Sequence, residues 1–449
     1  MGKMSIPFGF SPGGDDKNEL ADMLENMGRM LRNGGDPSGG SVNWTSAHSA
    51  SAEVLKSAGD PAITSADQER LRAAADLADL WLNEVTALPS AGHAIDTVTR
   101  SAWLANSFDT WKVMVQPVAD GVASAMTGML PSGNESGAVT FPEELLASLP
   151  PEVAENLRET LASPDFAAIT GPLMAMAKSM GATMFGTQFG QALGQMTTQV
   201  LSNSDVGIPL AAASKPGLVV TNVDAFIKGL SIDESDARLY VTLRELAHQR
   251  LFSAAPWIQS QLLAAICDYA RGVQIDTSAI EQAMTQVDPR DPESINSMMT
   301  SSLFEPTKTP AQVAALTRIE LLLALIEGWV NVVVTAAAGT RLPSASALEE
   351  VFRRRRASGG PAEKVLGELI GLEMRPRRMR EAAALWQRLA DTQGIAARDL
   401  LWSHPDLLPR DSDIDDIDAF LATGSEDLMA ELNKAIEADK NKPDSSSES

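Results

Sequence analysis

Apolar residues recur every three or four positions along most of this chain, which is the period of an α-helix. The segment ADQERLRAAADLADLWLNEV, residues 66–85, keeps this spacing, and residues 95–130 repeat it around Trp103 and Trp111. We therefore expect a mainly α, multi-helix fold with at most a few short strands. Further helices are predicted over residues 234–253, 255–272, 310–338, 345–356, 361–371, 377–391 and 414–423.

One short run favours a β-strand. Residues Leu218 to Thr221 are apolar and largely β-branched, and they come before Asn222, which we expect to cap the next helix. In another helical segment, glycines recur every four positions, so they share one helix face and allow a second backbone to approach closely. They are Gly186, Gly190 and Gly194.

Composition divides the chain into three parts. Residues 1–40 are rich in Gly, Ser and Asp, which predicts a mobile arm. Residues 426–449 form an acidic, polar tail whose end we expect to be disordered. The helical pattern occupies residues 41–425, and its Met- and Gly-rich section at 142–205 is a candidate sub-domain.

Charge and cysteine content narrow the classes of function. The formal net charge is −23, and a strongly acidic chain repels phosphate backbones, so we expect no nucleic-acid partner. Cys267 is the single cysteine, which excludes a disulfide framework and a cysteine-based zinc finger and fits a reducing compartment. The first residues lack the apolar segment of a secretory signal, so we expect a cytoplasmic protein.

The most apolar run, Leu321 to Gly339, barely has the length needed to span a membrane. Glu327 and Asn331 lie near its middle, where hydrocarbon would penalise them, so we expect a buried helix and no membrane contact. A lone buried carboxylate needs a partner, because an unpaired one costs on the order of several kcal/mol or takes up a proton. Two partners are open, a metal ion or the guanidinium of Arg244.

A candidate site begins at Arg244-Glu245-Leu246-Ala247-His248. With histidine first, the motif would be H-E-x-x-H, in which two imidazoles bind one zinc ion and the glutamate accepts a proton from the bound water. Leucines form one apolar stripe of this helix, at positions 239, 243 and 246. We expect Arg244, Glu245 and His248 to share the other side, as the lining of a pocket would.

Several motifs together resemble a known family. They are LREL-AHQRLF followed by PWI, ALIEGWVNVVV, FRRRRASGGPAEKVLGELIGLEMRPRRMREAAALW and LWSHPDLLP. The chain resembles the zincin-like family of actinobacteria, whose members are assigned as zinc-dependent metalloproteases or hydrolases. A sister branch of that family is associated with the biosynthesis of a deazaflavin cofactor. The resemblance extends from about Phe8 to about Phe420.

This resemblance implies a helical zincin-like fold and, where the motif is complete, a zinc hydrolase site. It implies that Glu245 is the general base, that His248 is the second zinc ligand and that Glu327 is the third. Arg244 departs from the full motif because it stands in place of the first histidine. A protonated guanidinium has no lone pair to offer a metal, so zinc is in doubt as a cofactor.

Two hypotheses of different classes follow. In the first, the protein is a zincin-like metallopeptidase or hydrolase in which Glu245, His248 and Glu327 act as implied and a further ligand comes from outside the motif. In the second, it is a pseudoenzyme in which Arg244 takes the place of the metal charge, pairs with Glu327 and reaches toward Glu245. A peptide or protein partner would then bind in the former cleft, with Arg244 as an anchor for a carboxylate. The residues favour the second hypothesis as the activity.

The remaining histidines and the arginine runs are weaker candidates. We expect His48 and His93 to be exposed, and His404, which precedes Pro405, to cap or pack a helix end while serving as a reserve ligand. The arginine runs could bind phosphate or an acidic partner, but we expect neighbouring glutamates to pair with them. The runs are Arg353 to Arg356 and Arg375, Arg377, Arg378 and Arg380, and the glutamates are Glu349, Glu350, Glu373 and Glu381.

Overall fold

The computed structural model describes residues 40–128, 132–133, 139–140, 164–205, 207–210, 215–271, 309–357 and 378–423. The chain divides into two compact units. One consists of Met1–Ala47 and Pro131–Thr187, and the other of His48–Leu130 and Gln188–Ser449, which holds every candidate site residue. The predicted arm, sub-domain and tail stay predictions, because residues 1–39, 141–163 and 424–449 lie outside the described residues.

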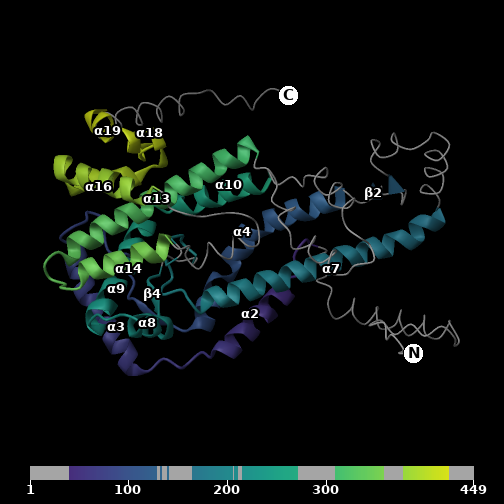
Figure 1. Cartoon of the computed structure of the whole chain (residues 1–449), viewed down its shortest axis with the longest axis horizontal. Helices are drawn as coiled ribbons and strands as arrows, with labels where there is room; N and C mark the ends of the chain where they lie inside the picture. Colours follow the sequence, from purple (N-terminus) through teal and green to yellow (C-terminus); the bar gives the residue numbers. More distant parts are fainter. Residues whose placement is uncertain are drawn as a thin grey trace, which may run out of the picture. The chain divides into compact units, whose positions relative to one another are not determined.

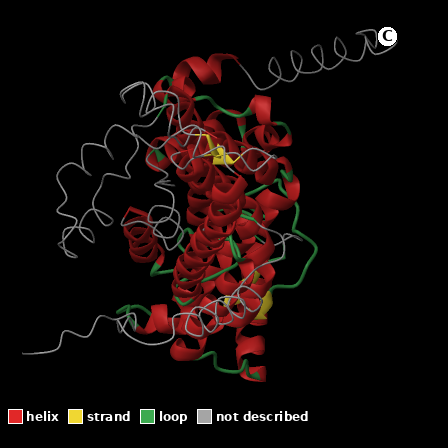
Figure 2. Cartoon of the chain, turned by 90° about the vertical axis from the view of Figure 1, so that its right-hand side faces the viewer, coloured by secondary structure: helices red, strands yellow, loops and turns green. Residues whose placement is uncertain are grey.

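Helices make up most of the described residues, which confirms the mainly α fold (Figure 1). Figure 2 shows the same predominance of helix from a second direction. The longer helices are α2 (Trp44–Ala58), α3 (Ser65–Leu82), α4 (Arg100–Gly128), α7 (Pro164–Thr197), α8 (Val220–Lys228), α9 (Glu234–Ala254), α10 (Trp257–Arg271), α13 (Pro310–Ala338), α14 (Ala345–Ala357) and α16 (Met379–Gln393). The shorter ones are α17 (Ile395–Leu400), η2 (Leu401–Ser403), η3 (Pro405–Leu407), α18 (Asp411–Asp415) and α19 (Ile417–Thr423).

Most predicted helix boundaries are confirmed to within about two residues. One exception is the helix predicted over 414–423, which is two short helices because α18 ends at Asp415 and α19 starts at Ile417. The other is the helical region predicted over 95–130, whose first residues form strand β1 (Asp96–Val98), so that α4 starts only at Arg100. The helix predicted over 361–371 lies outside the described residues.

The strands are short and form two separate pairs, one of which joins segments far apart in the sequence. β1 (Asp96–Val98) runs parallel to β4 (Gly217–Val219), with Asp96 opposite Gly217, while β2 (Ser132–Gly133) and β3 (Val139–Thr140) form an antiparallel pair. The predicted strand near Leu218 is therefore present, one residue earlier and shorter than expected. The capping role predicted for Asn222 is wrong. It lies inside α8, buried, and its amide donates to the carbonyls of Thr197 and Val200.

α9 and α13 form the buried centre of the second unit. α9 begins after Asp233, whose carboxylate accepts from the backbone N–H groups of the first turn, and α13 begins with a capping box between Thr309 and Gln312. From Ala237 to Phe252 every residue of α9 except Arg238 is buried. A helix is buried all round only when other elements cover each of its faces. For α9 these include α3, α8, α13 and α14.

α13 lies so close to α16 that one position between them has no room for a side chain. A Cβ atom on Gly328 would come within 2.8 Å of a backbone nitrogen of α16. Next to it, Trp329 is fully buried and meets Trp402 edge-on with 6.5 Å between ring centroids. Trp386 of α16 stacks on the same Trp402 ring at 5.3 Å. This packing holds the middle of α13, and with it Glu327, in place.

The glycine face predicted on α7 is confirmed at two of its three positions. A Cβ on Gly186 would overlap the backbone oxygen of Asn43, at 2.3 Å, within the first unit. In the second unit, a Cβ on Gly194 would lie 3.0 Å from the backbone oxygen of Ser51. Both positions therefore allow the close approach of another backbone.

Among the described residues, one helix, α13, is long and apolar enough to span a membrane by length and composition. Of its most apolar window, 72% is buried inside the protein, as in the core helix of many soluble proteins. The predicted burial of this segment is confirmed, and the expected lack of membrane contact stays a prediction.

Candidate functional site

The buried carboxylate of α13 is paired with the arginine of the motif. Arg244 Nη2 donates to Glu327 Oε2 at 2.7 Å, and the two side chains are 8% and 2% exposed. α9 and α13 pack against each other, so these residues meet although 83 positions separate them. The predicted pairing of Arg244 with Glu327 is confirmed. Phe352 of α14 covers the guanidinium, with its ring centroid 4.8 Å from the Arg244 Cζ atom.

Two more nitrogen donors converge on the same carboxylate. Arg356 Nη2 donates to Glu327 Oε1 at 2.6 Å, and His248 Nε2 lies 3.2 Å from the same oxygen. The other ring nitrogen of His248 lies 2.8 Å from the backbone oxygen of Arg244. Each ring nitrogen thus lies within hydrogen-bonding distance of an oxygen atom. Glu327 is therefore held by two guanidinium groups and an imidazole.

These neighbours control the protonation of Glu327. Burial by itself raises the pKa of this carboxyl group, but Arg356, Arg244 and His248 outweigh burial and hold its pKa well below the usual range for glutamate. Burial likewise favours the neutral form of Arg244, and Glu327 reverses this and raises the pKa of the guanidinium. Both partners are therefore charged at neutral pH.

Glu245, the candidate general base, is directed away from this cluster. Its carboxylate accepts from the hydroxyl and the backbone N–H of Ser204, from Gly217 N at 3.0 Å and from Gln249 Nε2 at 3.1 Å. It is 1% exposed, and it joins the loop around Ser204 to strand β4. These four donors occupy both oxygens of the Glu245 carboxylate.

The prediction that Arg244, Glu245 and His248 share one face is therefore wrong for Glu245, and so is the expected reach of Arg244 toward it. Each helical residue turns the side-chain direction by about 100°, so residues four apart lie about 40° apart while adjacent ones diverge. Arg244 and His248 point the same way, and Glu245 does not. The role of Glu245 as a base stays a prediction without support from its hydrogen bonds.

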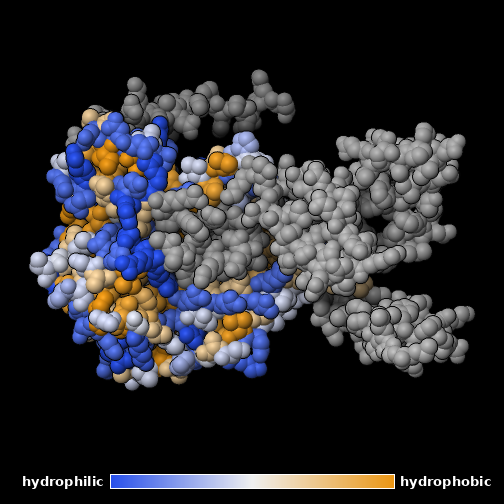
Figure 3. Space-filling view, viewed as in Figure 1, coloured by the Kyte–Doolittle hydropathy of each residue, from blue (hydrophilic) through white to orange (hydrophobic). Residues whose placement is uncertain are grey.

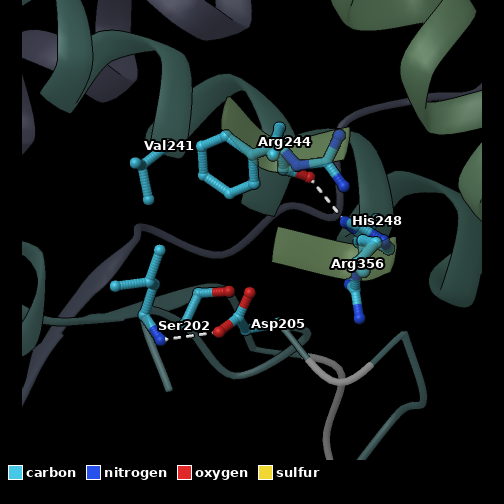
Figure 4. Close-up of a pocket in the computed structure, with 8 residues that line it drawn as sticks. Ser202, Asp205, Val241, Arg244, His248 and Arg356 are labelled. Carbon is cyan, nitrogen blue, oxygen red and sulfur yellow. Dashed lines mark hydrogen bonds between the residues drawn. The ribbon is translucent and has the colours of Figure 1, made fainter. Parts of the chain in front are cut away.

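A small pocket opens beside the cluster, with room for about one water molecule. Figure 4 shows Arg244, His248 and Arg356 on one side of it and Ser202 and Asp205 on the other. Leu201, Val241 and Phe352 complete the lining with apolar surface. The pocket therefore has two guanidinium groups and an imidazole on one side, a hydroxyl and a carboxylate on the other, and apolar side chains between them.

The loop that forms the far wall is tied to α14. Asp205 Oδ2 accepts from Arg355 at 2.9 Å and from the backbone N–H of Leu201 at 2.9 Å. Burial raises the pKa of Asp205, and Arg355 and Arg356 more than reverse this, so its pKa lies below the ordinary value. Gly207 follows with φ +77°, and a Cβ there would lie 3.1 Å from Glu327 Oε1. This glycine lets the loop pass directly over the buried carboxylate.

The arginine run of α14 divides between two environments, which corrects the expectation that neighbouring glutamates would pair with all of it. Arg353 and Arg354 do pair with Glu350, and the surface over α14 is hydrophilic in Figure 3. Arg355 and Arg356 instead reach inward, to Asp205 and Glu327. A helix of period 3.6 cannot keep four consecutive side chains on its solvent face. The sequence did hold a signal for the inward direction of Arg356. It lies four residues after the apolar Phe352 and therefore on the same face of the helix.

The other predicted residues lie elsewhere. His404 is not part of the pocket lining, and its ring accepts from the backbone N–H of Asp406 as the cap of η3, so the predicted capping role is confirmed. His48 and His93 are exposed as expected. Arg378 pairs with Asp411 and Asp415 of α18 rather than with a glutamate, and Arg375 and Arg377 lie outside the described residues.

The donor set of the cluster does not fit zinc. Zinc needs three or four lone pairs from His, Cys or carboxylate groups converging on one point. Here Arg244 occupies the first position of the motif, and both oxygens of Glu327 accept from cations. Within the ranges that the structure describes, no group of three or more His, Cys, Asp or Glu side chains could hold a metal ion. His248 and Glu327 do come together, but two guanidinium groups come with them.

Comparison with known proteins gives a family and a fold. A family model described as zincin-like metallopeptidase matches residues 42–421. A crystal structure from Chloroflexus aurantiacus, of "a putative hydrolase with a novel fold", is similar to this chain with a TM-score of 0.54 at 17% identity, over 85% of this chain and 98% of that one. At this identity the likeness shows the fold alone. No curated protein gives a significant match. The narrower resemblance to actinobacterial members and to a deazaflavin-associated branch stays a prediction.

Proposed function

The chain belongs to the zincin-like metallopeptidase family, and we propose that this member is a pseudoenzyme that binds a partner instead of hydrolysing one through zinc. The guanidinium of Arg244 supplies the positive charge that a metal supplies in members with the full motif. As part of the same proposal, the protein acts in the cytoplasm on a peptide or protein partner, without nucleic acid or membrane.

One observation carries this proposal, the 2.7 Å hydrogen bond between Arg244 Nη2 and Glu327 Oε2. Glu327 is the best candidate for a distal ligand, and its charge is already neutralised by a side chain that cannot bind metal. A zinc ion at this point would face repulsion from Arg244 and from Arg356 as well. The residue that would have to act as the base, Glu245, is committed to four donors.

The second candidate is a zinc hydrolase with an altered ligand set. It is favoured by the family match and by the 3.2 Å approach of His248 Nε2 to Glu327, since two of the implied ligands already converge. This candidate requires Arg244 and Arg356 to leave the carboxylate and requires Glu245 to turn from Ser204. Each of these movements would break a buried or partly buried hydrogen bond.

The test compares the natural chain with Arg244→His, both purified without chelators or a histidine tag. Elemental mass spectrometry measures zinc per chain, and a peptide library measures hydrolysis. We expect the natural chain to hold far less than one zinc even after incubation with excess metal, and Arg244→His to hold more, because it completes the i, i+4 histidine pair.

About one zinc in the natural chain, with a hydrolysis that is lost in Glu245→Gln, would overturn the proposal in favour of the hydrolase. Arg244→Gln serves as the control, since it removes the same guanidinium without adding a ligand. If zinc binding rises equally in both variants, the gain comes from lost repulsion rather than from the restored histidine.

A further inference from the structure

We propose that the pocket beside Glu327 binds a carboxylate group of the partner, gripped between Arg244 and Arg356. This inference deepens the proposed function, and rests on it, because the same two guanidinium groups would have to withdraw if zinc occupied the site. It assigns the site a ligand class, a peptide acid, and assigns Arg356 the role of a binding residue.

The charges of the cluster do not balance. Two guanidinium groups, those of Arg244 and Arg356, pair with the single carboxylate of Glu327, and His248 adds a further donor to it. Beside this cluster, Arg355 pairs with Asp205. Excess positive charge in a place of low water content attracts an anion. The acids cannot supply more negative charge, since the pKa values of both are already lowered.

The hydrogen-bond donors do not balance either. A guanidinium has five N–H groups. In the part of the chain that the structure describes, Arg244 and Arg356 each use one of them, both toward Glu327. The two side chains are only 8% and 12% exposed, and both line the pocket. The donors that they do not use can serve a ligand with oxygen acceptors that enters the pocket.

The shape of the pocket favours a carboxylate over a larger anion. Phe352 covers one face of the Arg244 guanidinium, so the edge with its N–H groups is the side left for a ligand. A planar carboxylate matches the fork of a guanidinium with two parallel hydrogen bonds. The room for about one water molecule admits one planar group more readily than a tetrahedral phosphate. Leu201 and Val241 form apolar walls that strengthen such bonds.

Asp205 forms the far wall of the pocket. It is 8% exposed, and its oxygen Oδ2 accepts from Arg355 and from the backbone of Leu201. Its charge also acts on Arg356 and Arg244, so a ligand that binds between these two arginines shares them with Asp205. The hydroxyl of Ser202 adds a neutral group of the kind that hydrogen-bonds a carboxylate oxygen.

The experiment uses the full chain and three probes at constant ionic strength, followed by calorimetric titration and by thermal unfolding. The probes are acetyl-alanyl-alanine, the same dipeptide as its C-terminal amide, and inorganic phosphate. We expect the acid to bind and to raise the Tm, and the amide to do neither, because it lacks the charge. Phosphate is expected to bind more weakly than the acid.

Two matched variants locate the site. Arg356→Gln removes one of the two gripping guanidinium groups and is expected to weaken binding of the acid by about tenfold or more, the change that corresponds to about 1.4 kcal/mol. Arg354→Gln makes the same substitution two residues earlier, at an exposed arginine paired with Glu350, and is expected to leave binding unchanged. Arg356→Gln is preferred to a change at Arg244 because Glu327 then keeps two partners and the fold survives.

Equal binding of acid and amide, or equal weakening by the two variants, would overturn the proposal. Tighter binding of phosphate with the same dependence on Arg356 would replace the carboxylate with a phosphoryl ligand. Acetate and an acetylated aspartate amide test whether the bound carboxylate must be a peptide C-terminus or can be any small carboxylate. If they match the dipeptide acid, any small carboxylate fits, and if the dipeptide acid is much tighter, the ligand is a peptide C-terminus. If the protein holds no zinc and also binds no carboxylate, this inference is rejected. The proposal that the protein lacks zinc catalysis would still stand.

Discussion

Two buried carboxylates lie on either side of the middle of α13, and their surroundings differ. Asp399 of α17 accepts from Trp329 Nε1 at 2.8 Å, from Thr86 Oγ1 at 2.6 Å, from the backbone of Ala87 at 2.7 Å and from Arg398 Nε at 2.7 Å. It thus has one cation and three neutral donors. Glu327, two residues before Trp329, has two guanidinium groups and His248, and a pocket beside it.

This difference distinguishes the structural ion pair at Asp399 from the candidate binding site at Glu327. At Asp399 the charges balance one to one, and Nη2 of Arg398 donates to the backbone oxygen of Val85 and to Asp399 Oδ2. At Glu327 two guanidinium groups share one carboxylate, and a pocket lies beside them. The neutral Arg398–Asp399 pair joins α17 to the α3–β1 loop and to α13. The positively charged cluster at Glu327 lies beside a pocket and therefore has capacity for a ligand. Substitutions in the two clusters should therefore act on different properties.

The largest effect on stability is expected at the Arg398–Asp399 pair. Asp399→Asn leaves the guanidinium of Arg398, which is 1% exposed, without a counter-ion. Breaking a buried pair in this way costs about 3–5 kcal/mol. Chemical denaturation of the purified protein measures the change in the free energy of unfolding. A loss below about 1 kcal/mol would show that the pair is not sealed from water.

The second effect, slightly smaller, is expected at the arginine of the motif. Arg244→Ala removes one of the three donors of Glu327, and we expect a loss of about 3 kcal/mol, the low end for a buried pair, because Arg356 and His248 remain. Arg238→Ala on the same helix is the control, since the Arg238–Asp224 pair is more exposed, and its effect should be much smaller. An unchanged Tm in Arg244→Ala would contradict the burial of the cluster.

The third prediction concerns pH. The pKa of Glu327 is lowered in the folded protein, so its pairing stabilises the fold above the unfolded pKa, about 4.3, and this contribution is lost as the pH falls below that value toward the folded pKa. The difference in unfolding free energy between the natural chain and Glu327→Gln should therefore shrink on acidification, by about 2 kcal/mol between about pH 5 and about pH 2. Urea unfolding at several pH values measures it. A difference that does not change with pH would mean that Glu327 is not charged in the fold.

The smallest effect is expected at the outer arginine of the cluster. Arg356→Gln should lower the free energy of unfolding by about 1 kcal/mol, since one charge-assisted hydrogen bond is lost and the carboxylate keeps two partners. Arg354→Gln should leave stability unchanged. Thermal unfolding of both variants compares them directly. If Arg356→Gln destabilised the fold as much as Arg244→Ala, the surplus of positive charge would be needed for the fold rather than for a ligand.

The pattern of residues along the chain was enough to predict most of the helices and one ion pair of the candidate site. The apolar period located α9, α10, α13 and α16, and a lone carboxylate in an apolar helix was enough to infer that Glu327 meets Arg244. The direction of Glu245 could not be inferred in the same way, since its partners Ser204 and Gly217 come from a loop and a strand elsewhere in the chain. The capping role predicted for Asn222 failed for the same reason, because its acceptors belong to another segment.

The amino-acid sequence alone decided where the helices form, that α13 is buried, and that Arg244 cannot bind a metal, because these follow from side-chain chemistry and from spacing along one helix. The tertiary structure decided which cations gather at Glu327. Arg356 lies 29 residues from Glu327, and the packing of α14 against α9 and α13 brings its guanidinium to the carboxylate. Charge balance at a buried site depends on every element packed around it, so the surplus that suggests a ligand exists only in the folded protein.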